Sequence, residues 1–466
     1  MRSVPPVNDR PATVCIVTFG CQMNKLDSEL LRGALAREGF GLTDRPDDAD
    51  VVLYNTCSVR DHAENRVLSH LGAHRRRARK DGGFVLGVIG CMAQRLGADL
   101  VRQFDHVRLV CGTGALLRVP GHLRRIMAGE GPVVDLGAGE PTAAHRTPQV
   151  RESPVQTYVS IMRGCNNYCS YCIVPYVRGR EVSRPAGQIV AEVRALAEDG
   201  VKEVTLLGQN VNSYRADGHG GDEGRGLAQL LAALNETAGL LRLRFVTSHP
   251  KDMSDEILDA VAALDKVCEH LHVPPQSGSD AVLERMNRRY TAAGYRDVVA
   301  RARARVPGVE LAGDFIVGFP GETDADFEDS LALLREVRFQ QAYLFKYSPR
   351  PGTRAARWAD DVPDEVKRER HQRMLEAQKE ADTARRAATV GREVEVLVEG
   401  VSKGDERHYT GRTRGGDIVV FPGCDAMVGT LQLLRIVSAT ALTLFGAEGE
   451  RDHHGDTEDT ENDTAL

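Results

Sequence analysis

Short apolar runs alternate with longer amphipathic stretches through most of this chain, and this alternation is the strongest constraint on its fold. It is typical of parallel sheets in which a helix follows each strand. Near the N-terminus we expect strands at 13–20, 51–57, 84–91 and 106–112, with helices at 26–39, 61–80 and 93–104. The sequence thus predicts an open parallel α/β domain over residues 12–128, with a linker rich in Gly, Pro and Ala over 114–154.

A second and longer series of strand–helix units begins near Gln156. It fits a partial parallel barrel of the (βα)6 type over residues 151–382. Its strands are expected at 156–162, 203–208, 242–247, 267–273, 310–317 and 341–347, and its helices include 186–199, 255–264 and 323–337. In both domains a ligand site is expected at the carboxyl ends of the strands, because these ends share one edge of a parallel sheet.

The pattern changes toward the C-terminus. A charged helix is predicted at 363–388, and short alternating strands with Gly turns then predict a small β-barrel or sandwich over 385–446. Residues 447–466 carry eight acidic residues and one Arg without apolar periodicity, so they predict a disordered acidic tail. Because the net charge is −6, the remainder of the chain is close to neutral. The glycine-rich stretch at 215–226, RADGHGGDEGRG, is expected to be a flexible insertion.

No apolar run approaches the length of about eighteen residues that a membrane helix needs, so we expect no membrane association. The first residues lack the basic-then-apolar layout of a secretory signal, and the expected location is the cytoplasm. In that compartment ten cysteines do not indicate a disulfide framework, so their positions in the predicted fold carry more information than their number.

Three cysteines each come at or just past the end of a predicted N-terminal strand. We call Cys21, Cys57 and Cys91 the strand-end triad. Because the carboxyl ends of parallel strands meet at one edge, the sequence predicts that these three thiols converge in space. Cys15, by contrast, lies in mid-strand among apolar neighbours, as structural cysteines do.

A second set of cysteines lies in one tight loop after the first predicted barrel strand. Cys165, Cys169 and Cys172, here called the loop triad, have the spacing C-x3-C-x2-C. Three thiolates at this spacing can wrap one corner of an iron–sulfur cubane and leave one iron open to an exogenous ligand. A zinc site would need a fourth protein ligand nearby, and no His follows at a usable spacing, so zinc is the weaker alternative.

The loop triad, with an aromatic residue before its last cysteine, resembles the motif of radical S-adenosylmethionine (SAM) enzymes. Its flanking sequence, RGCNNYCSYCIVPYVRGREVSR, is similar to that of the methylthiotransferase family, as are TFGCQMNKLDSE, NTCSVR and GCMAQR. Four separated motifs agree, and the resemblance extends over about residues 13–446. It implies a radical SAM barrel in the middle of the chain and a TRAM domain, an RNA-binding β-barrel, over 385–446.

The resemblance also implies cofactors and ligands. The loop triad would hold the [4Fe–4S] cluster that cleaves SAM, and the strand-end triad would hold an auxiliary [4Fe–4S] cluster that presents sulfur. One SAM would methylate that sulfur and a second would supply a 5′-deoxyadenosyl radical, so two SAM molecules are expected per turnover. No residue is assigned as a general acid or base. The SAM-binding candidates are Tyr171, Gly208, Gln209, Asn210, Gln276, Ser277 and Gly318.

The reaction implied is methylthiolation of carbon 2 of N6-(dimethylallyl)adenosine in tRNA. This carbon bears an unactivated C–H bond, so a radical is required, and the base must be exposed in a loop such as the anticodon stem-loop. Arg178, Arg180 and Arg184 are candidates for contacts with RNA phosphates. A flavodoxin- or ferredoxin-like electron donor and a sulfur carrier for cluster repair are the other expected partners.

Two alternatives share this chemistry and differ in substrate. Related enzymes act on threonylcarbamoyl-adenosine in tRNA or on an aspartate of a small-subunit ribosomal protein. The sequences Gln22-Met23-Asn24, Ser58-Val59-Arg60 and Asn166-Asn167 favour the dimethylallyl substrate. A third alternative, of a different class, is a non-catalytic iron–sulfur protein that binds RNA or senses redox state; the complete cluster loop and the SAM-like elements argue against it.

Overall fold

The computed structural model describes residues 11–58, 61–137, 139, 150–216 and 226–448. It divides into two compact units, Met1–Asp382 and Thr383–Leu466, and each is described by itself. Most of the predicted insertion at 215–226 and nearly all of the predicted acidic tail lie outside the described residues. None of the helices in these described ranges combines the length and the apolar character needed to cross a bilayer.

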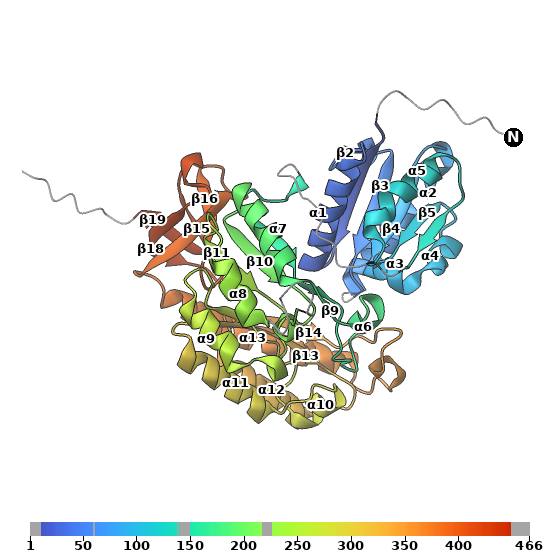
Figure 1. The fold of residues 1–466 in the computed structure, drawn as a ribbon. Helices are drawn as coiled ribbons and strands as arrows, with labels where there is room; N and C mark the ends of the chain where they lie inside the picture. Colours follow the sequence, from blue (N-terminus) through green and yellow to red (C-terminus); the bar gives the residue numbers. More distant parts are fainter. Residues whose placement is uncertain (1–10, 59–60, 138, 140–149, 217–225, 449–466) are drawn as a thin grey trace, which may run out of the picture. The chain divides into compact units, whose positions relative to one another are not determined.

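The first unit opens with a six-stranded parallel sheet, ordered β2-β1-β3-β4-β5-β6 (Figure 1). The strands are β1 (Thr13–Phe19), β2 (Gly41–Leu42), β3 (Val51–Thr56), β4 (Val85–Gly90), β5 (Val107–Cys111) and β6 (Val133–Asp135). In the register, Phe19 of β1 pairs with Thr56 of β3, and Thr56 pairs with Gly90 of β4. The three strands that precede Cys21, Cys57 and Cys91 are therefore neighbours and end level with one another.

Helices cover both faces of this sheet. They are α1 (Gln22–Arg37), α2 (Asp61–Lys80), α3 (Cys91–Leu96), α4 (Ala98–Gln103) and α5 (Val119–Met127). Alternate residues of β3 show the two layers: Val51 and Leu53 pack with α1 and α5, whereas Val52 and Tyr54 pack with α2 and α4. This two-sided burial explains why the strand sequences are nearly continuous apolar runs.

Two sequence predictions in this domain need correction. Part of the predicted linker at 114–154 folds into α5 and β6, because the apolar side chains of Val119, Leu123 and Ile126 recur at helical spacing and pack on the sheet. The single helix predicted at 93–104 is two short helices, since Gly97 has a φ of +52° and breaks it.

Two parallel three-stranded sheets make the second part of the first unit, in the orders β11-β10-β7 and β12-β13-β14. A parallel bridge between Leu243 and Val267 joins them, so six parallel strands form the predicted partial (βα)6 barrel. The strands are β7 (Gln156–Ser160), β10 (Glu203–Leu207), β11 (Arg242–Phe245), β12 (His270–His272), β13 (Glu310–Val317) and β14 (Gln341–Lys346). A short antiparallel pair, β8 (Met162–Arg163) and β9 (Val182–Ser183), flanks the loop triad.

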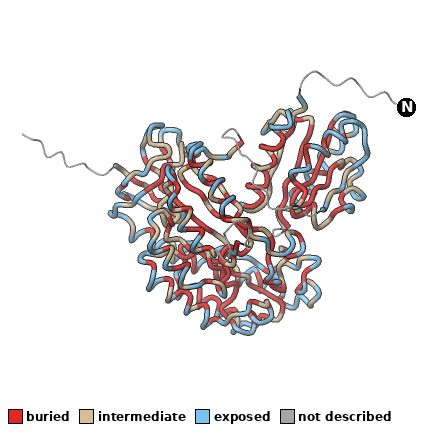
Figure 2. The backbone as a smooth tube through the Cα atoms, viewed as in Figure 1, coloured by how far each residue is buried: buried red, intermediate tan, exposed pale blue. Residues whose placement is uncertain are grey.

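The helices of the barrel lie outside its strands. They are α6 (Val174–Val177), α7 (Ala186–Glu198), α8 (Leu227–Asn235), α9 (Asp255–Ala263), α10 (Asp280–Arg285), α11 (Ala292–Arg305) and α12 (Asp324–Val337). The inner faces of α7, α8, α9, α11 and α12 share one continuous apolar core with the strands, which appears in Figure 2 as buried strands with helices that are buried on one side only. This rigid core holds the loops at the carboxyl ends of the strands, where the candidate site lies.

The second unit is a closed five-stranded barrel in the order β15-β16-β17-β19-β18. Its strands are β15 (Glu393–Val401), β16 (His408–Thr413), β17 (Ile418–Pro422), β18 (Leu431–Ala439) and β19 (Leu444–Glu448). Its small core includes Val396, Val398, Phe421 and Ile436. Helix α13 (Asp364–Ala387) precedes it, close to the helix predicted at 363–388. Closure into a barrel, which leaves no free strand edge, decides between the two forms that the sequence allowed.

Candidate active site

The sheet edge brings the strand-end triad together as predicted from the strand pattern. Cys21 follows β1 and begins the turn into α1, Cys57 follows β3, and Cys91 is the first residue of α3 after β4. The backbone N–H of Cys57 donates to the carbonyl of Phe19 at 3.0 Å, which ties the end of β3 to the end of β1. The thiol of Cys21 receives a hydrogen bond from Cys57, so these two sulfur atoms are in contact.

Two buried asparagines, Asn24 and Asn55, hold the residues around this triad by hydrogen bonds. Only Asn24 was singled out in the sequence. Asn24 Oδ1 lies 3.3 Å from Cys21 Sγ, and Asn24 Nδ2 donates to Asn55 Oδ1 at 3.0 Å. Asn55 Nδ2 in turn donates to the Asn24 carbonyl at 2.9 Å. This reciprocal amide pair links the start of α1 to the end of β3. Asn24 stands in a motif that the sequence analysis used, but nothing local to Asn55 marks it as the partner.

The thiols of the strand-end triad are not equivalent. The hydrogen bond from Cys57 lowers the pKa of Cys21 to about 6, against the effect of burial. Burial raises the pKa of Cys91, and the nearby Arg178 guanidinium acts in the opposite direction. Cys21 is therefore largely a thiolate at neutral pH, which is the form that binds metal.

The loop triad lies between β8 and α6 with its sulfurs gathered by the chain itself. Cys165 N–H donates to the Gly179 carbonyl at 3.2 Å, and Cys172 N–H donates to the Cys169 carbonyl at 3.0 Å. Gly164, with a φ of +78°, lies so close to the Arg180 carbonyl that a Cβ there would clash with it. Burial raises the pKa of Cys165, and burial together with the charge of Cys169 raises that of Cys172 to about 12.

Arg288 is a neighbour of the loop triad that the sequence analysis did not assign to it. Its Nη1 lies 3.4 Å from Cys169 Sγ and 3.4 Å from the Tyr171 hydroxyl, and its Nη2 donates to the Pro274 carbonyl at 3.1 Å. Its two chain neighbours, Asn287 and Arg289, adopt left-handed backbone conformations, with φ of +59° and +60°. Only the tertiary structure shows this contact, since 119 residues separate Arg288 from Cys169.

The SAM-binding candidates after β10 surround the start of the cluster loop. Gln209 accepts a hydrogen bond from the Gly164 N–H through its Oε1, so it holds the loop triad in place. Gly208 packs on Met162, where a Cβ would lie 2.6 Å from Met162 Cγ. Asn210 is buried, and its Nδ2 donates to Asp252 at 2.8 Å.

The remaining SAM-binding candidates divide into two groups. Tyr171 is half-buried beside Arg288 and packs edge-on against Phe319, and Gln276, with a φ of +69°, pairs through its backbone with β13. Ser277 is buried with its hydroxyl 3.0 Å from the Ser330 hydroxyl, and Gly318 packs against Lys367. The structure therefore gives Ser277 and Gly318 evident roles in packing the barrel.

Two of the three arginines predicted to contact phosphates lie in buried ion pairs. The Arg178 and Arg184 side chains are buried, Arg178 ion-paired with Asp27 at 2.7 Å and Arg184 with Glu192 at 2.7 Å. A guanidinium enclosed in this way cannot meet a phosphate without breaking its ion pair. Arg180 remains exposed, and its backbone adjoins the cluster loop.

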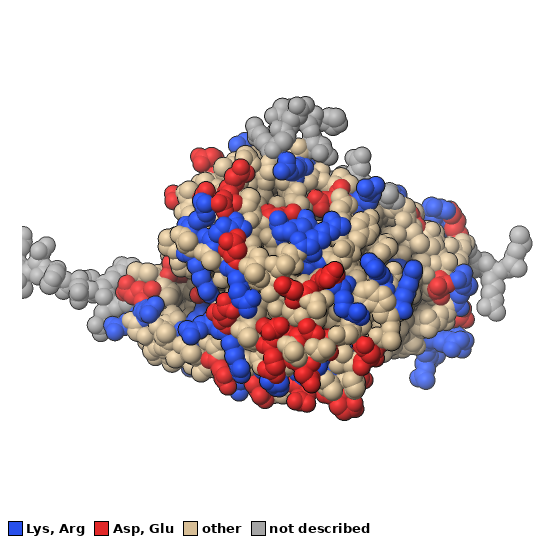
Figure 3. Space-filling model, turned by 90° about the horizontal axis from the view of Figure 1, so that it is seen from below, with Lys and Arg blue, Asp and Glu red and all other residues tan. Residues whose placement is uncertain are grey.

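The basic cluster at 301–305 on α11 is also paired within the protein. Arg301 and Arg305 both bind Asp255, at 2.6 and 2.5 Å, and Arg305 also binds Asp259. Figure 3 shows acidic side chains interspersed with the basic ones on one face of the molecule. These arginines form a surface of ion pairs rather than a single basic patch for nucleic acid.

Two exposed aromatic side chains flank the loop triad and were missed by the sequence analysis. Tyr168, between Cys165 and Cys169, is 43% exposed, and Tyr176 on α6 is 55% exposed. Their rings lie edge to face with centroids 6.2 Å apart. Tyr168 has a φ of +48°, and Asn287 Nδ2 donates to its carbonyl at 3.0 Å. Such left-handed backbone is uncommon outside glycine and concentrates at functional sites.

A short segment connects the two triads. Ile173 comes directly after Cys172, and Val177 is the last residue of α6. Both pack against Cys91 of the strand-end triad. The Thr113 hydroxyl after β5 donates to the Val177 carbonyl at 2.8 Å. Both triads therefore lie at the meeting of the N-terminal sheet and the barrel, within the first compact unit.

The donor sets fit iron–sulfur clusters better than single metal ions. Within the described ranges, no three His, Cys, Asp or Glu side chains are close enough to share one ion. In a cubane each thiolate binds a different iron, so the ligands stand apart around the cluster. Three thiols in each triad, with no His or carboxylate among them, are the soft donors that such clusters take.

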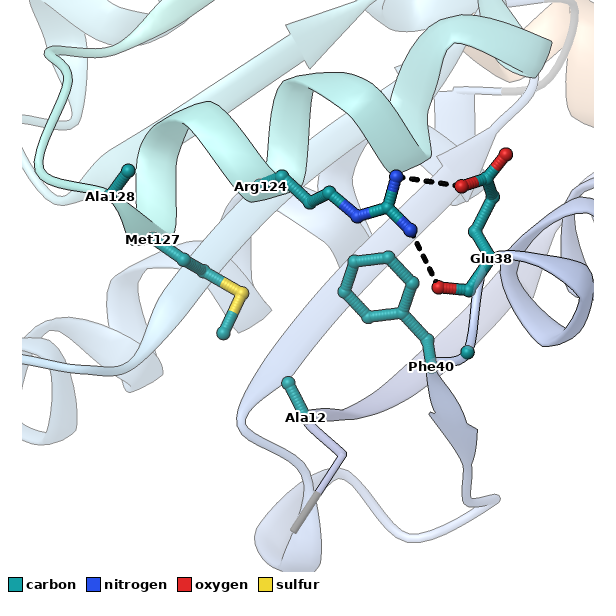
Figure 4. Close-up of a pocket in the computed structure, with 7 residues that line it drawn as sticks. Ala12, Glu38, Phe40, Arg124, Met127 and Ala128 are labelled. Carbon is teal, nitrogen blue, oxygen red and sulfur yellow. Dashed lines mark hydrogen bonds and ion pairs between the residues drawn. The ribbon is translucent and has the colours of Figure 1, made fainter. Parts of the chain in front are cut away.

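The surface of the N-terminal domain has a hollow that lies away from both cysteine triads. It is lined by Ala12, Phe40, Met127 and Ala128 beside an ion pair between Arg124 and Glu38 at 2.6 Å (Figure 4). None of the six cysteines of the triads lines it. Its side chains belong to a surface groove between α1 and α5, and they form no catalytic constellation.

Three family models match successive parts of the chain. Residues 13–112 match Uncharacterized protein family UPF0004, residues 159–334 match the Radical SAM superfamily, and residues 387–436 match the TRAM domain. They correspond to the α/β sheet, the partial barrel and the closed β-barrel, in that order.

Relatives match across all three parts. A tRNA-2-methylthio-N(6)-dimethylallyladenosine synthase of Acetivibrio thermocellus is 45% identical over 93% of this chain and 90% of its own length. That of Clostridium novyi is 44% identical over 92% of this chain and 95% of its own. The radical SAM methyltransferase TsrM of Kitasatospora setae shares the fold, with a TM-score of 0.52 at 17% identity over 74% of this chain and 77% of that one. The chain belongs to the tRNA-2-methylthio-N(6)-dimethylallyladenosine synthase family of radical SAM methylthiotransferases.

Proposed function

We propose that this protein adds a methylthio group to carbon 2 of N6-(dimethylallyl)adenosine in the anticodon loop of tRNA. The observation that carries this conclusion is the pair of cysteine triads joined by α6, in a chain 45% identical to a relative named for this product. A single triad would suit many radical SAM reactions. The second triad is what a reaction that inserts sulfur requires.

The two triads divide the cofactors between them. Cys165, Cys169 and Cys172 hold one [4Fe–4S] cluster, and Cys21, Cys57 and Cys91 hold the auxiliary cluster. When bound, these clusters and two molecules of SAM per turnover supply the electron, the carbon radical, the sulfur and the methyl group. We assign the auxiliary cluster to the domain at 12–128, SAM cleavage to 151–382 and RNA binding to 385–446, with 447–466 as a tail.

SAM binds over the carboxyl ends of the barrel strands, beside the loop triad. Gln209 orients the loop by accepting from Gly164 through its Oε1, and its Nε2 donates to the methionyl carboxylate. Tyr171 and Gln276 stand on the same side of the barrel, from the cluster loop and from the segment after β12. Gly208 and Asn210 complete this edge, while Ser277 and Gly318 act on the ligand indirectly, by fixing the backbone around them.

The RNA approaches the exposed side of the cluster loop. Tyr168 and Tyr176 offer ring surface for stacking of unpaired bases, and the exposed Arg180 offers a charge for a phosphate. Stacking on aromatic side chains is the usual way in which proteins bind bases that are splayed out of a loop. This surface selects a loop over a paired stem, in which carbon 2 of adenine is inaccessible.

The remaining partners follow from the chemistry. A flavodoxin- or ferredoxin-like protein supplies electrons, and a sulfur carrier rebuilds the auxiliary cluster after each turnover. The cytoplasm is the compartment in which tRNA and such reductants occur together.

The decisive experiment uses anaerobically reconstituted protein with SAM and a strong reductant. Anticodon stem-loops that carry dimethylallyl-adenosine, threonylcarbamoyl-adenosine or unmodified adenosine are supplied separately, and the nucleosides are analysed by mass spectrometry. We expect a methylthio product from the dimethylallyl substrate alone. A product only from threonylcarbamoyl-adenosine would overturn the substrate assignment, and the absence of 5′-deoxyadenosine from every reaction would overturn the enzyme class.

A further inference from the structure

A buried ion pair lies between the two cysteine triads. Asp27 belongs to α1, which begins just after Cys21, and Arg178 follows α6, which begins just after Cys172. Arg178 Nη2 lies 2.7 Å from Asp27 Oδ2, and the two side chains are only 9% and 10% exposed. The pair therefore connects the helix next to one triad with the helix next to the other.

Arg178 also faces the thiols of the strand-end triad. Its charge acts on both Cys91 and Cys21, and Asp27 acts on Cys91 with the opposite sign. Cys91 packs on Val177, the residue directly before Arg178, so the backbone that carries Arg178 lies next to the triad. One positive and one negative charge thus stand beside the same group of sulfurs.

Docking of α6 on the N-terminal domain does not itself call for these charges. Ile173 and Val177 already supply apolar contact with Cys91, and Thr113 supplies a hydrogen bond to the Val177 carbonyl. Removing two charges from water is costly, and an apolar pair of similar size often holds two helices together at least as well. A buried pair that is not needed for docking points to a role for the charges themselves.

We propose that Asp27 and Arg178 set the electrostatic potential at the strand-end triad, with Arg178 as a positioning residue that favours the reduced form of the group held there. The reduction potential of an iron–sulfur cluster depends on nearby charge and on hydrogen bonds to its sulfurs. A cation beside Cys91 and Cys21 stabilises an added electron, and Asp27 both aims this cation and limits its effect. The proposal rests on the assignment of an auxiliary cluster to Cys21, Cys57 and Cys91.

The two charges make opposite predictions, which separates an electrostatic role from a structural one. The test uses the full chain with Cys165, Cys169 and Cys172 replaced by Ala, so that the auxiliary cluster alone is present, and measures its midpoint potential by redox titration with electron paramagnetic resonance. Arg178→Gln is expected to lower the potential and Asp27→Asn to raise it. The double variant, which removes both charges, is expected to lie between them.

Matched controls come from an ion pair farther along α1. Arg32 and Asp44 lie 2.9 Å apart and are more exposed, and neither is among the charges that shift the pKa of Cys21 or of Cys91. Arg32→Gln and Asp44→Asn are expected to leave the potential unchanged. Arg178→Lys keeps the charge and should keep most of the wild-type potential. If Arg178→Gln does not retain iron, Asp27→Asn, which is expected to raise the potential, carries the test.

The outcomes are distinct. Shifts of Arg178→Gln and Asp27→Asn in the same direction, or no shift while about four irons per chain are retained, would show that the pair only packs, and would overturn the proposal. The proposal also fails if Arg178→Lys shifts the potential as much as Arg178→Gln. If the background variant binds no iron at all, the fault lies with the auxiliary cluster assignment and not with the role of the ion pair.

Discussion

The loop triad and the strand-end triad carry the same number of thiols but are assembled differently. The loop triad lies within one short loop after β8, in which the Cys172 N–H donates to the Cys169 carbonyl, and Gln209 and Asn287 bind this loop from other segments. The strand-end triad exists only because β1, β3 and β4 are neighbours in register. One site depends mainly on spacing in the sequence and the other on the integrity of a sheet.

The triads also differ in their charged surroundings. Arg288 meets Cys169 together with tyrosine hydroxyls and a backbone carbonyl, and the structure shows no carboxylate bonded to it within the described residues. Arg178 meets the strand-end triad with Asp27 attached. The arginine at the loop triad thus has no bonded carboxylate among the described residues, whereas the arginine at the strand-end triad is paired with one.

The largest effect is expected from replacing the cysteines of either triad. The two replacements should abolish different activities. Cys165→Ala/Cys169→Ala/Cys172→Ala should abolish both 5′-deoxyadenosine formation and methylthiolation, since no SAM is cleaved. Cys21→Ala/Cys57→Ala/Cys91→Ala should retain SAM cleavage and lose the methylthio product. Each should lower iron from about eight to about four atoms per chain. Iron analysis and mass spectrometry of both products check this, and a strand-end variant that still methylthiolates would contradict it.

The glycine before the first cysteine of each triad offers a subtler comparison. A Cβ on Gly20 would lie 2.6 Å from Asn24 Oδ1 and 2.7 Å from Cys57 Cβ, and a Cβ on Gly164 would clash with the Arg180 carbonyl. Both have positive φ, +152° for Gly20 and +78° for Gly164, and such backbone costs a residue other than glycine about 1–3 kcal/mol. Gly20→Ala should lower iron occupancy with SAM cleavage retained, and Gly164→Ala should lower it with SAM cleavage lost.

Gly39→Ala is the matched control for these two variants. Gly39 has a φ of +82° but open space where its Cβ would stand, so it tests backbone strain without a clash. It should keep full iron and lose only a little stability in thermal unfolding. Equal loss of both cluster activities from Gly20→Ala and Gly164→Ala would mean that the two triads are not independent structures.

A moderate effect is expected at the exposed tyrosines beside the loop triad. Tyr168→Ala or Tyr176→Ala should raise KM for the anticodon stem-loop roughly five- to a hundredfold, because a stacked base contributes about 1–3 kcal/mol. Uncoupled SAM cleavage without RNA should stay unchanged, and Phe in place of either Tyr should restore binding. An unchanged KM in both Ala variants would exclude these rings from the RNA site. The strand-end triad has no such exposed pair next to it among the described residues.

The smallest effect is a difference in thiol reactivity of the reduced, iron-free protein. With a pKa of about 6, Cys21 is mostly thiolate at pH 7.5, whereas Cys172, at about 12, is protonated. Since the thiolate is the nucleophile, iodoacetamide should label Cys21 first. Labelling of Cys172 should rise as pH increases from 7 to 9, while that of Cys21 should barely change. Peptide mass spectrometry measures both rates, and faster labelling of Cys172 at pH 7.5 would contradict the assignment.

The sequence alone determined the strand–helix alternation, the two triads and the order of the three folded parts. These features depend on local patterns: apolar runs of strand length, cysteines at fixed spacing, and Gly turns between short strands. The convergence of Cys21, Cys57 and Cys91 also followed from the sequence, because the carboxyl ends of parallel strands must share an edge. The sequence failed at α5 and β6, where a short amphipathic helix is hidden in a region rich in Gly and Pro.

Only the tertiary structure decided what each charged or polar side chain does. Arg178 and Arg184 follow the cluster loop in sequence and look suited to RNA, yet Arg178 is enclosed with Asp27 from a distant segment and Arg184 with Glu192 of the next helix. Arg288 reaches Cys169, and Ser277 bonds to Ser330, across long stretches of chain. A partner 100 or more residues away leaves no local periodicity, as with the 151 residues between Asp27 and Arg178. Such contacts arise from the packing of whole elements, which is why the sequence could locate the site but not its electrostatics.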